Sequence, residues 1–197
     1  MHLLGSKICG INLAFCLSIC WAGGQDVDIT SEVQPIGVRI KVATVLTVPY
    51  DSIWSTLTDY DQLSSFVPGI KSSTLVNRDG TSAFVRQIGE ARLLFFKVPL
   101  NVLVRTTEKK PYSISVELVE GNLRHLSGRY TLRRLSPDNS WELSWEGIID
   151  PELRLPDFVT RALIQRDIKA QFEAMIFEIK RRAKDYVPVE SMKNDND

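Results

Sequence analysis

The spacing of apolar residues changes close to Asp157, and this change restricts the folds that the chain can adopt. Before this point, apolar residues occupy every second position in several runs, most clearly in 94–104, as in strands with one apolar face. After it, an apolar stripe with a period of 3.6 predicts one helix of roughly thirty residues. The stripe comprises Ile168, Phe172, Met175, Ile176, Ile179 and Ala183.

Turn sequences divide the region before Asp157 into seven expected strands. Separators such as Asp79-Gly80 and Gly121-Asn122 favour tight turns between antiparallel neighbours. The strands are expected at 36–48, 70–77, 82–91, 94–104, 113–118, 126–133 and 141–149.

The segment 48–73 interrupts this series and predicts two short helices. Pro49 ends the first strand, and Asp51 stands where an N-cap residue accepts hydrogen bonds from free helix amides. The second helical turn ends at Pro68-Gly69, which cannot continue a helix. Helical spacing recurs in the apolar residues of the first helix, Ile53, Trp54 and Leu57.

These elements predict an α+β fold in which a curved, seven-stranded antiparallel sheet wraps around the long C-terminal helix. An order of strand, two short helices, six strands and one long helix leaves few compact arrangements. Wrapping is the simplest of them, because the apolar faces of the sheet and the helix then bury each other.

Residues 1–24 have the layout of a secretory signal peptide. Lys7 precedes the apolar run 8–22, which ends in small residues before an acidic segment. A membrane anchor is the alternative, but this run is shorter than the roughly 20 apolar residues of a spanning helix. Lipid attachment at Cys20 is disfavoured, because Ile19 stands where a small residue is expected. We therefore expect an exported, periplasmic protein.

The rest of the chain is expected to form a polar lead-in at 25–35, a single domain at 36–187 and a disordered tail at 188–197. A composition of 44% hydrophobic and 24% charged residues is ordinary for a globular domain. The 24 basic and 24 acidic residues balance, which argues against nucleic acid as a partner, since such binding depends on a basic surface.

Four motifs carry a resemblance to a known group of proteins. They are VPYDSIWSTLTDYD at 48–61, FVPGI at 66–70, RQIGEARL at 86–93 and LSGRY at 126–130. They resemble the coenzyme Q-binding START and polyketide cyclase/dehydrase group of the SRPBCC, or Bet v 1-like, superfamily, over about 36–186. The resemblance implies a helix-grip fold with an apolar cavity between the sheet and the long helix. Carriers, cyclases, hydrolases and lipid-transfer proteins all occur in this superfamily, so it does not identify the ligand.

Few residues offer catalytic chemistry. His125 is the only histidine after the expected signal peptide, and all three cysteines lie within that peptide. We therefore expect no metal site and no catalytic residue. The sequence contains no Gly-rich phosphate loop, and we expect no cofactor. Asp59 and Asp61, which flank Tyr60, are interpreted as helix caps in preference to an acid/base pair.

The strand at 82–91 is ambiguous, because either face could point inward. An inward Arg86–Glu90 pair would contact a ligand head group or form a buried structural pair. The first face carries Phe84, Arg86, Ile88 and Glu90, and the second carries Ala83, Val85 and Gln87.

The leading hypothesis is a non-enzymatic binding or transfer protein for a hydrophobic small molecule, such as an isoprenoid quinone or another lipid. A polyketide-type cyclase or dehydratase using Arg86, Glu90 or Tyr130 is the enzymatic alternative. A third reading is an interaction module with a filled core, whose basic helix end makes transient contact with anionic membranes. The expected ligand-binding residues are Trp54, Phe66, Phe84, Arg86, Phe96, Leu100, Val116, Tyr130, Trp145, Phe158 and Phe172.

Overall fold

The computed structural model describes residues 27–93, 96–136, 138–152 and 155–185. The expected signal peptide at 1–24 and the expected tail at 188–197 lie outside the described residues. Within them, no helix is long and apolar enough to cross a membrane.

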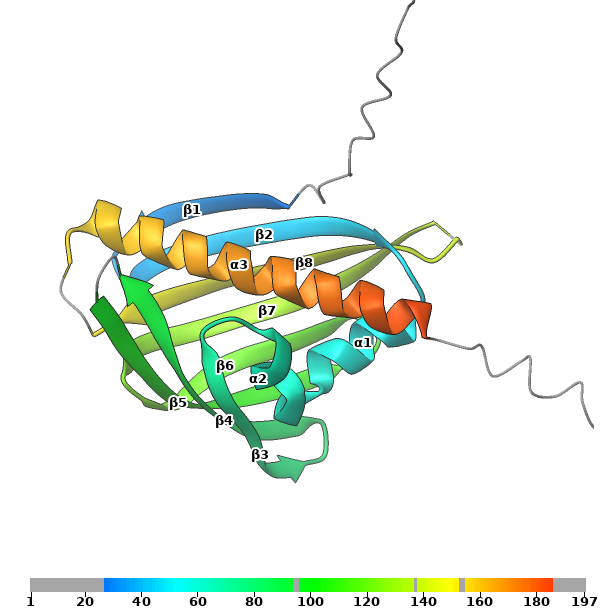
Figure 1. The fold of residues 1–197 in the computed structure, drawn as a ribbon, viewed down its shortest axis with the longest axis horizontal. Helices are drawn as coiled ribbons and strands as arrows, with labels where there is room; N and C mark the ends of the chain where they lie inside the picture. The colour runs from blue at the N-terminus through cyan, green and yellow to red at the C-terminus, as the bar shows by residue number, and fades with distance from the viewer. Residues whose placement is uncertain (1–26, 94–95, 137, 153–154, 186–197) are drawn as a thin grey trace, which may run out of the picture.

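An antiparallel sheet makes up most of the described chain (Figure 1). Among the described residues it has eight strands, in the order β1-β2-β8-β7-β6-β5-β4-β3. Every pair of neighbours is antiparallel, as short connections favour. The strands are β1 (Asp28–Gln34), β2 (Gly37–Thr47), β3 (Ile70–Asp79), β4 (Ser82–Leu93), β5 (Phe96–Lys109), β6 (Ser113–Gly121), β7 (Leu123–Ser136) and β8 (Ser140–Pro151).

The expected count of seven strands is wrong, because part of the expected polar lead-in forms β1. This strand has no continuous apolar face: it pairs with β2 through its backbone, with Asp28 opposite Ala43. As an edge strand it tolerates polar side chains. The Ser31 hydroxyl donates a hydrogen bond to Oε1 of Gln165 at 2.5 Å, which joins β1 to the long helix.

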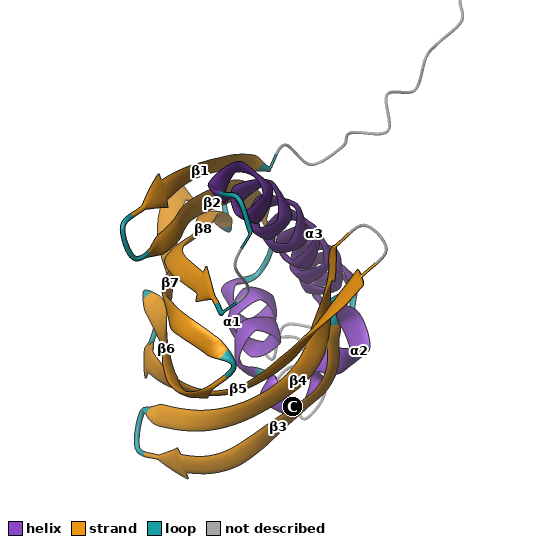
Figure 2. Cartoon of the chain, turned by 90° about the vertical axis from the view of Figure 1, so that its left-hand side faces the viewer, coloured by secondary structure: helices purple, strands orange, loops and turns teal. Residues whose placement is uncertain are grey.

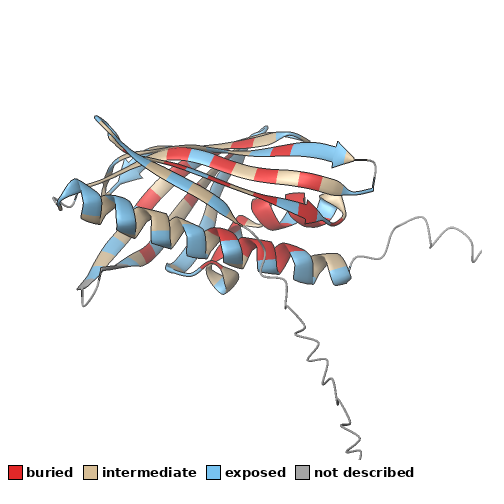
Figure 3. Cartoon of the chain, turned by 90° about the horizontal axis from the view of Figure 1, so that it is seen from above, coloured by how far each residue is buried: buried red, intermediate tan, exposed pale blue. Residues whose placement is uncertain are grey.

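The curved sheet wraps around the long helix α3 (Asp157–Lys184), as the helix-grip prediction requires (Figure 2). Inward side chains of the sheet form the core with the C-terminal half of α3, whereas its N-terminal half is largely unburied (Figure 3). The expected stripe on α3 is confirmed, since its central members Phe172, Met175, Ile176 and Ile179 are buried.

The segment between β2 and β3 folds into α1 (Tyr50–Thr58), a 3-10 turn (Tyr60–Gln62) and α2 (Leu63–Phe66). The expected N-cap position at Asp51 is wrong. Pro49 precedes α1 and Pro156 precedes α3, so Asp51 and Asp157 lie in the first turns of their helices. At these positions their negative charges still face the positive ends of the helix dipoles.

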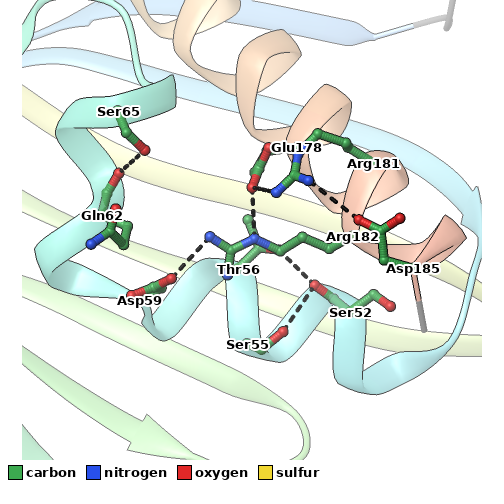
Figure 4. A network of polar contacts seen from close by, with 10 residues as sticks. All are labelled: Ser52, Ser55, Thr56, Asp59, Gln62, Ser65, Glu178, Arg181, Arg182 and Asp185. Atoms are coloured by element: carbon green, nitrogen blue, oxygen red, sulfur yellow. Dashed lines mark hydrogen bonds and ion pairs between the residues drawn. The ribbon is translucent and has the colours of Figure 1, made fainter. Parts of the chain in front are cut away.

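The interpretation of Asp59 and Asp61 as caps is also wrong. Asp59 Oδ2 accepts a hydrogen bond from Nη2 of Arg182 at 2.9 Å, within a network that includes Glu178 (Figure 4). Asp61 Oδ1 accepts a hydrogen bond from the backbone amide of Leu75 at 2.7 Å. The two carboxylates therefore attach this segment to α3 and to β3.

Candidate functional site: an apolar cavity

A cavity of about 540 Å³ lies between the concave face of the sheet and α3. Ala91, Pro99 and Glu152 line one end of it and are exposed, so the cavity reaches the surface beside the N-terminal half of α3. The N-terminal end of α3 faces the viewer in Figure 2. The polar residues that line it are Tyr60, Gln87, Thr106, Asn122, Tyr130, Glu152, Thr160, Asp167 and Gln171.

The cavity brings together five of the residues expected from the sequence, contributed by four strands and α3. They lie on inward faces, as the period-two pattern of their strands and the helical stripe predicted. These five are Leu100, Val116, Tyr130, Trp145 and Phe172. Phe96 begins β5, but its side chain lies outside the described part of the molecule.

Trp54 and Phe66 lie outside the cavity lining, contrary to expectation. Trp54 is 7% exposed in α1 and stacks on Tyr50, with ring centroids 5.9 Å apart. Tyr50 in turn contacts Trp141, so these rings belong to the packed core at the far end of the sheet. The guanidinium of Arg182 lies over the Phe66 ring, with its Cζ 5.7 Å from the ring centroid.

Phe158 was expected to contact the ligand, but it also lies outside the cavity lining. It lies in the first turn of α3 and is 69% exposed. The neighbouring positions Thr160, Leu163 and Ile164 line the cavity instead. Their spacing continues the stripe of α3 toward its N-terminus, and this is the signal that could have identified them.

Phe84 and Arg86 point away from the cavity, which resolves the ambiguous strand. Val85 lies opposite Val104 of β5, and both are buried. Since directly opposed residues of an antiparallel pair share a face, Ala83, Val85 and Gln87 face inward. The second of the two faces considered is therefore the inner one.

The Arg86–Glu90 pair does not exist inside the protein. Arg86 forms an ion pair with Glu120 at 2.5 Å on the outer face. Glu90 pairs with Lys71 at 2.6 Å and with Lys97 at 3.2 Å. Hydrogen bonding from Lys71, followed by that from Lys97, holds the pKa of Glu90 below its usual range. This placement removes two of the three residues on which the enzymatic alternative depended.

Two glycines leave the space that the indole of Trp145 occupies. A Cβ added to Gly128 would lie 2.7 Å from the indole, and one added to Gly147 would lie 2.5 Å from it. These glycines are opposite each other in β7 and β8, so the indole lies flat against the backbone of both strands. Bare backbone at this point leaves room inside the cavity that side chains would otherwise fill.

The pKa values of the two tyrosines that line the cavity are raised above the usual value for a phenol. Burial raises the pKa of Tyr130 to about 12, and it is the largest cause of the raised pKa of Tyr60. The Tyr60 hydroxyl donates to Oε1 of Glu108 at 3.0 Å and accepts from the Thr106 hydroxyl at 3.0 Å. Both phenols therefore remain protonated near neutral pH.

His125 takes no part in the cavity. It is half-buried on the outer side of β7, and its Nε2 lies 2.9 Å from the hydroxyl of Ser127. The described part of the chain holds no group of three or more side chains placed to bind a metal ion.

Comparison with known proteins decides the family. Residues 46–176 match the family model described as polyketide cyclase/dehydrase and lipid transport. The chain belongs to this family. The match covers all of the described residues that line the cavity, from Leu57 to Met175. No curated protein matches the sequence.

Solved structures of related fold include members named for lipids and for cyclisation. A STAR-related lipid transfer protein from Xanthomonas axonopodis has a TM-score of 0.67 at 11% identity, over 80% of this chain and 96% of that one. The Zhui aromatase/cyclase from Streptomyces sp. R1128 has a TM-score of 0.60 at 16% identity, and the match covers 73% of this chain and 94% of that one. Human STARD10 has a TM-score of 0.62 at 12% identity, and the match covers 86% of this chain and 78% of that one. At these identities the likeness shows a shared fold.

Proposed function

We propose that this protein binds and carries a hydrophobic small molecule, such as an isoprenoid quinone or another lipid, in the cavity between the sheet and α3. The observation that carries the proposal is a cavity of about 540 Å³ with a mainly apolar lining that reaches the surface. This volume is within the range of roughly 300–1,000 Å³ for small-molecule sites. Apolar area removed from water supplies about 25 cal/mol per Å², enough for affinity without polar chemistry.

The size of the cavity argues against an interaction module with a filled core. The family includes cyclases by its description, and this observation keeps the enzymatic function as a second candidate. Of the residues first considered for it, only Tyr130 lines the cavity. Because its hydroxyl stays protonated near neutral pH, it suits hydrogen bonding to a ligand better than proton abstraction.

The test is to extract the purified protein with organic solvent, identify what it holds by mass spectrometry, and titrate it with an uncharged apolar fluorescent probe. Leu100→Trp should fill part of the cavity and weaken probe binding. Val119→Trp is the matched control, because Val119 is exposed on β6. Recovery of no apolar compound, together with no binding of the probe, would refute the proposal.

Export of the protein is a separate part of the proposal. It is supported by the sequence pattern of residues 1–24, with the apolar run 8–22 after Lys7. Cell fractionation and N-terminal sequencing of the mature protein test it. A chain that retains Met1 and stays with the cytoplasmic fraction would contradict it.

A further inference from the structure

The charged side chains that line the cavity among the described residues are both carboxylates. Among the described residues, no Lys, Arg or His side chain lines it, whereas Glu152 and Asp167 do. Asp167 Oδ1 accepts a hydrogen bond from Nη2 of Arg166 at 2.8 Å, so this neighbouring guanidinium on α3 is opposed by a carboxylate. An anionic group entering the cavity would therefore meet carboxylates and no unopposed cation from these residues.

Two neutral amides in the lining are available to a ligand. Gln87 of β4 and Gln171 of α3 are half-buried, and neither forms a hydrogen bond within the described part of the chain. The amide of Asn122 is engaged, since its Oδ1 accepts from the amide of Asn101 at 2.8 Å and its Nδ2 donates to the carbonyl of Pro99 at 2.6 Å. Two uncommitted amides thus remain in a mainly apolar wall.

Both amides line the cavity, Gln171 close to Gly69 and Gln87 on β4 opposite Ser73 of β3. Nε2 of Gln171 is 4.0 Å from the position that a Cβ on Gly69 would occupy. The carbonyl of Gly69 accepts a hydrogen bond from the amide of Glu90 at 2.8 Å, three residues along β4 from Gln87. The two side chains therefore line the cavity from two walls, one formed by the sheet and one formed by α3.

We propose that the cavity selects an electrically neutral amphiphile, whose carbonyl or hydroxyl group hydrogen-bonds to Gln87 and Gln171, and that it excludes anionic lipids. This inference rests on the proposed binding function. A primary amide can donate to a carbonyl and exchange both kinds of hydrogen bond with a hydroxyl. It cannot neutralise a carboxylate or phosphate, and burying such a charge without a cation is strongly unfavourable.

The experiment compares three ligands that share one alkyl chain: decanol, decanamide and decanoate. Each displaces an uncharged fluorescent probe from the full chain at pH 8, where decanoate in water is ionised. Decanol and decanamide should displace the probe at similar concentrations, and decanoate should be weaker by about tenfold or more.

Variants of the two glutamines give the second arm. Gln87→Leu should weaken decanol and decanamide by about threefold to tenfold, because it removes hydrogen bonds to the head group, and should leave decanoate unchanged. Gln87→Lys should raise the affinity for decanoate and reduce the discrimination. Gln171→Lys on α3 repeats this test if the strand variant does not fold. Gln62→Leu is the matched control, since Gln62 is exposed and lies outside the cavity.

The outcomes separate this inference from the proposed function. Equal displacement by all three ligands, or tighter binding of decanoate, overturns the charge selection and leaves hydrophobic binding intact. Discrimination that persists unchanged in both lysine variants overturns the assignment to these two residues. Displacement by none of the ligands, with no probe bound, overturns the binding function itself.

Discussion

Replacing Glu178 with glutamine should destabilise the fold, because this carboxylate organises the network in Figure 4. Glu178 is 7% exposed on α3. It accepts hydrogen bonds from Nε of Arg181 and from Nε of Arg182, both at 2.7 Å. Arg182 also donates to Asp59, which follows α1 directly. The charge of Glu178 therefore helps to hold the end of α3 against α1.

The pKa of Glu178 indicates the size of the effect. Hydrogen bonding from Arg181, followed by that from Arg182 against the opposing effect of burial, lowers this pKa from 4.5 to about 2. A shift of this size alone corresponds to about 3 kcal/mol. The Arg181 side chain is 53% exposed, so solvent screens much of its charge. We therefore expect a loss of about 1–2 kcal/mol in Glu178→Gln.

The sign of the pH dependence follows from the same shift. Because the folded-state pKa lies below the unfolded-state value, the stabilisation is present above about pH 4.5 and is lost as the pH falls toward 2. Urea unfolding followed by circular dichroism at pH 7 and pH 3.5 measures it. The difference between wild type and Glu178→Gln should narrow at the lower pH.

The control for this experiment is Glu173→Gln. Glu173 lies on the same helix but is exposed, and it is 3.8 Å from Lys169. Its replacement should change the free energy of unfolding by less than about 0.5 kcal/mol. Equal stability of wild type and Glu178→Gln at pH 7 would refute the reasoning. A difference that does not change between pH 7 and pH 3.5 would refute the electrostatic explanation.

Two further predictions concern the cavity and the helix that covers it. Gly147→Ala places a Cβ 2.5 Å from the indole of Trp145, and should destabilise the fold by about 1–3 kcal/mol, shift the tryptophan emission and weaken probe binding. Ser144→Ala on the outer face of β8 is its control. Unchanged tryptophan emission in Gly147→Ala would contradict the close packing of the indole against Gly147. Phe172→Ala, at a residue 3% exposed, should lose about 3–5 kcal/mol of stability in urea unfolding. Phe158→Ala, at a residue 69% exposed, should change the free energy of unfolding by less than about 0.5 kcal/mol. Similar losses of stability in the two variants would show that burial does not explain the loss in Phe172→Ala.

The inner face of the sheet was predictable wherever one face of a strand was clearly apolar. In β5, Leu100, Val102 and Val104 continue a run of apolar residues at every second position, and all three line the cavity. In β4 both faces carry apolar side chains, so alternation could not choose between them. The choice depends on pairing with β5, which places Val85 opposite Val104. Pairing register is a long-range property that a pattern within one strand does not contain.

Roles that depend on distant partners were not predictable from local rules. Asp59 was read as a cap because its neighbours predicted short helices, yet its partner Arg182 lies 123 positions away. Residues 28–34 were read as a lead-in, because an edge strand held by backbone pairing needs no apolar face. The indole seat on Gly128 and Gly147 likewise requires knowledge of which strands are adjacent.

The two ends of α3 differ in a way that connects the fold to the proposed function. Toward the C-terminus, Ile176 and Ile179 are buried, and the one buried charge among the described residues there, Glu178, is paired with Arg181 and Arg182. Toward the N-terminus, Thr160 and Asp167 interrupt the stripe and line the cavity together with Ile164. A side chain that faces packed neighbours must be apolar or paired within the protein, as Glu178 is, whereas one that faces a cavity can be polar because a ligand or water can satisfy it. The mixed character of the first half of α3 is therefore expected of a helix that serves as the core at one end and as the wall of a binding site at the other.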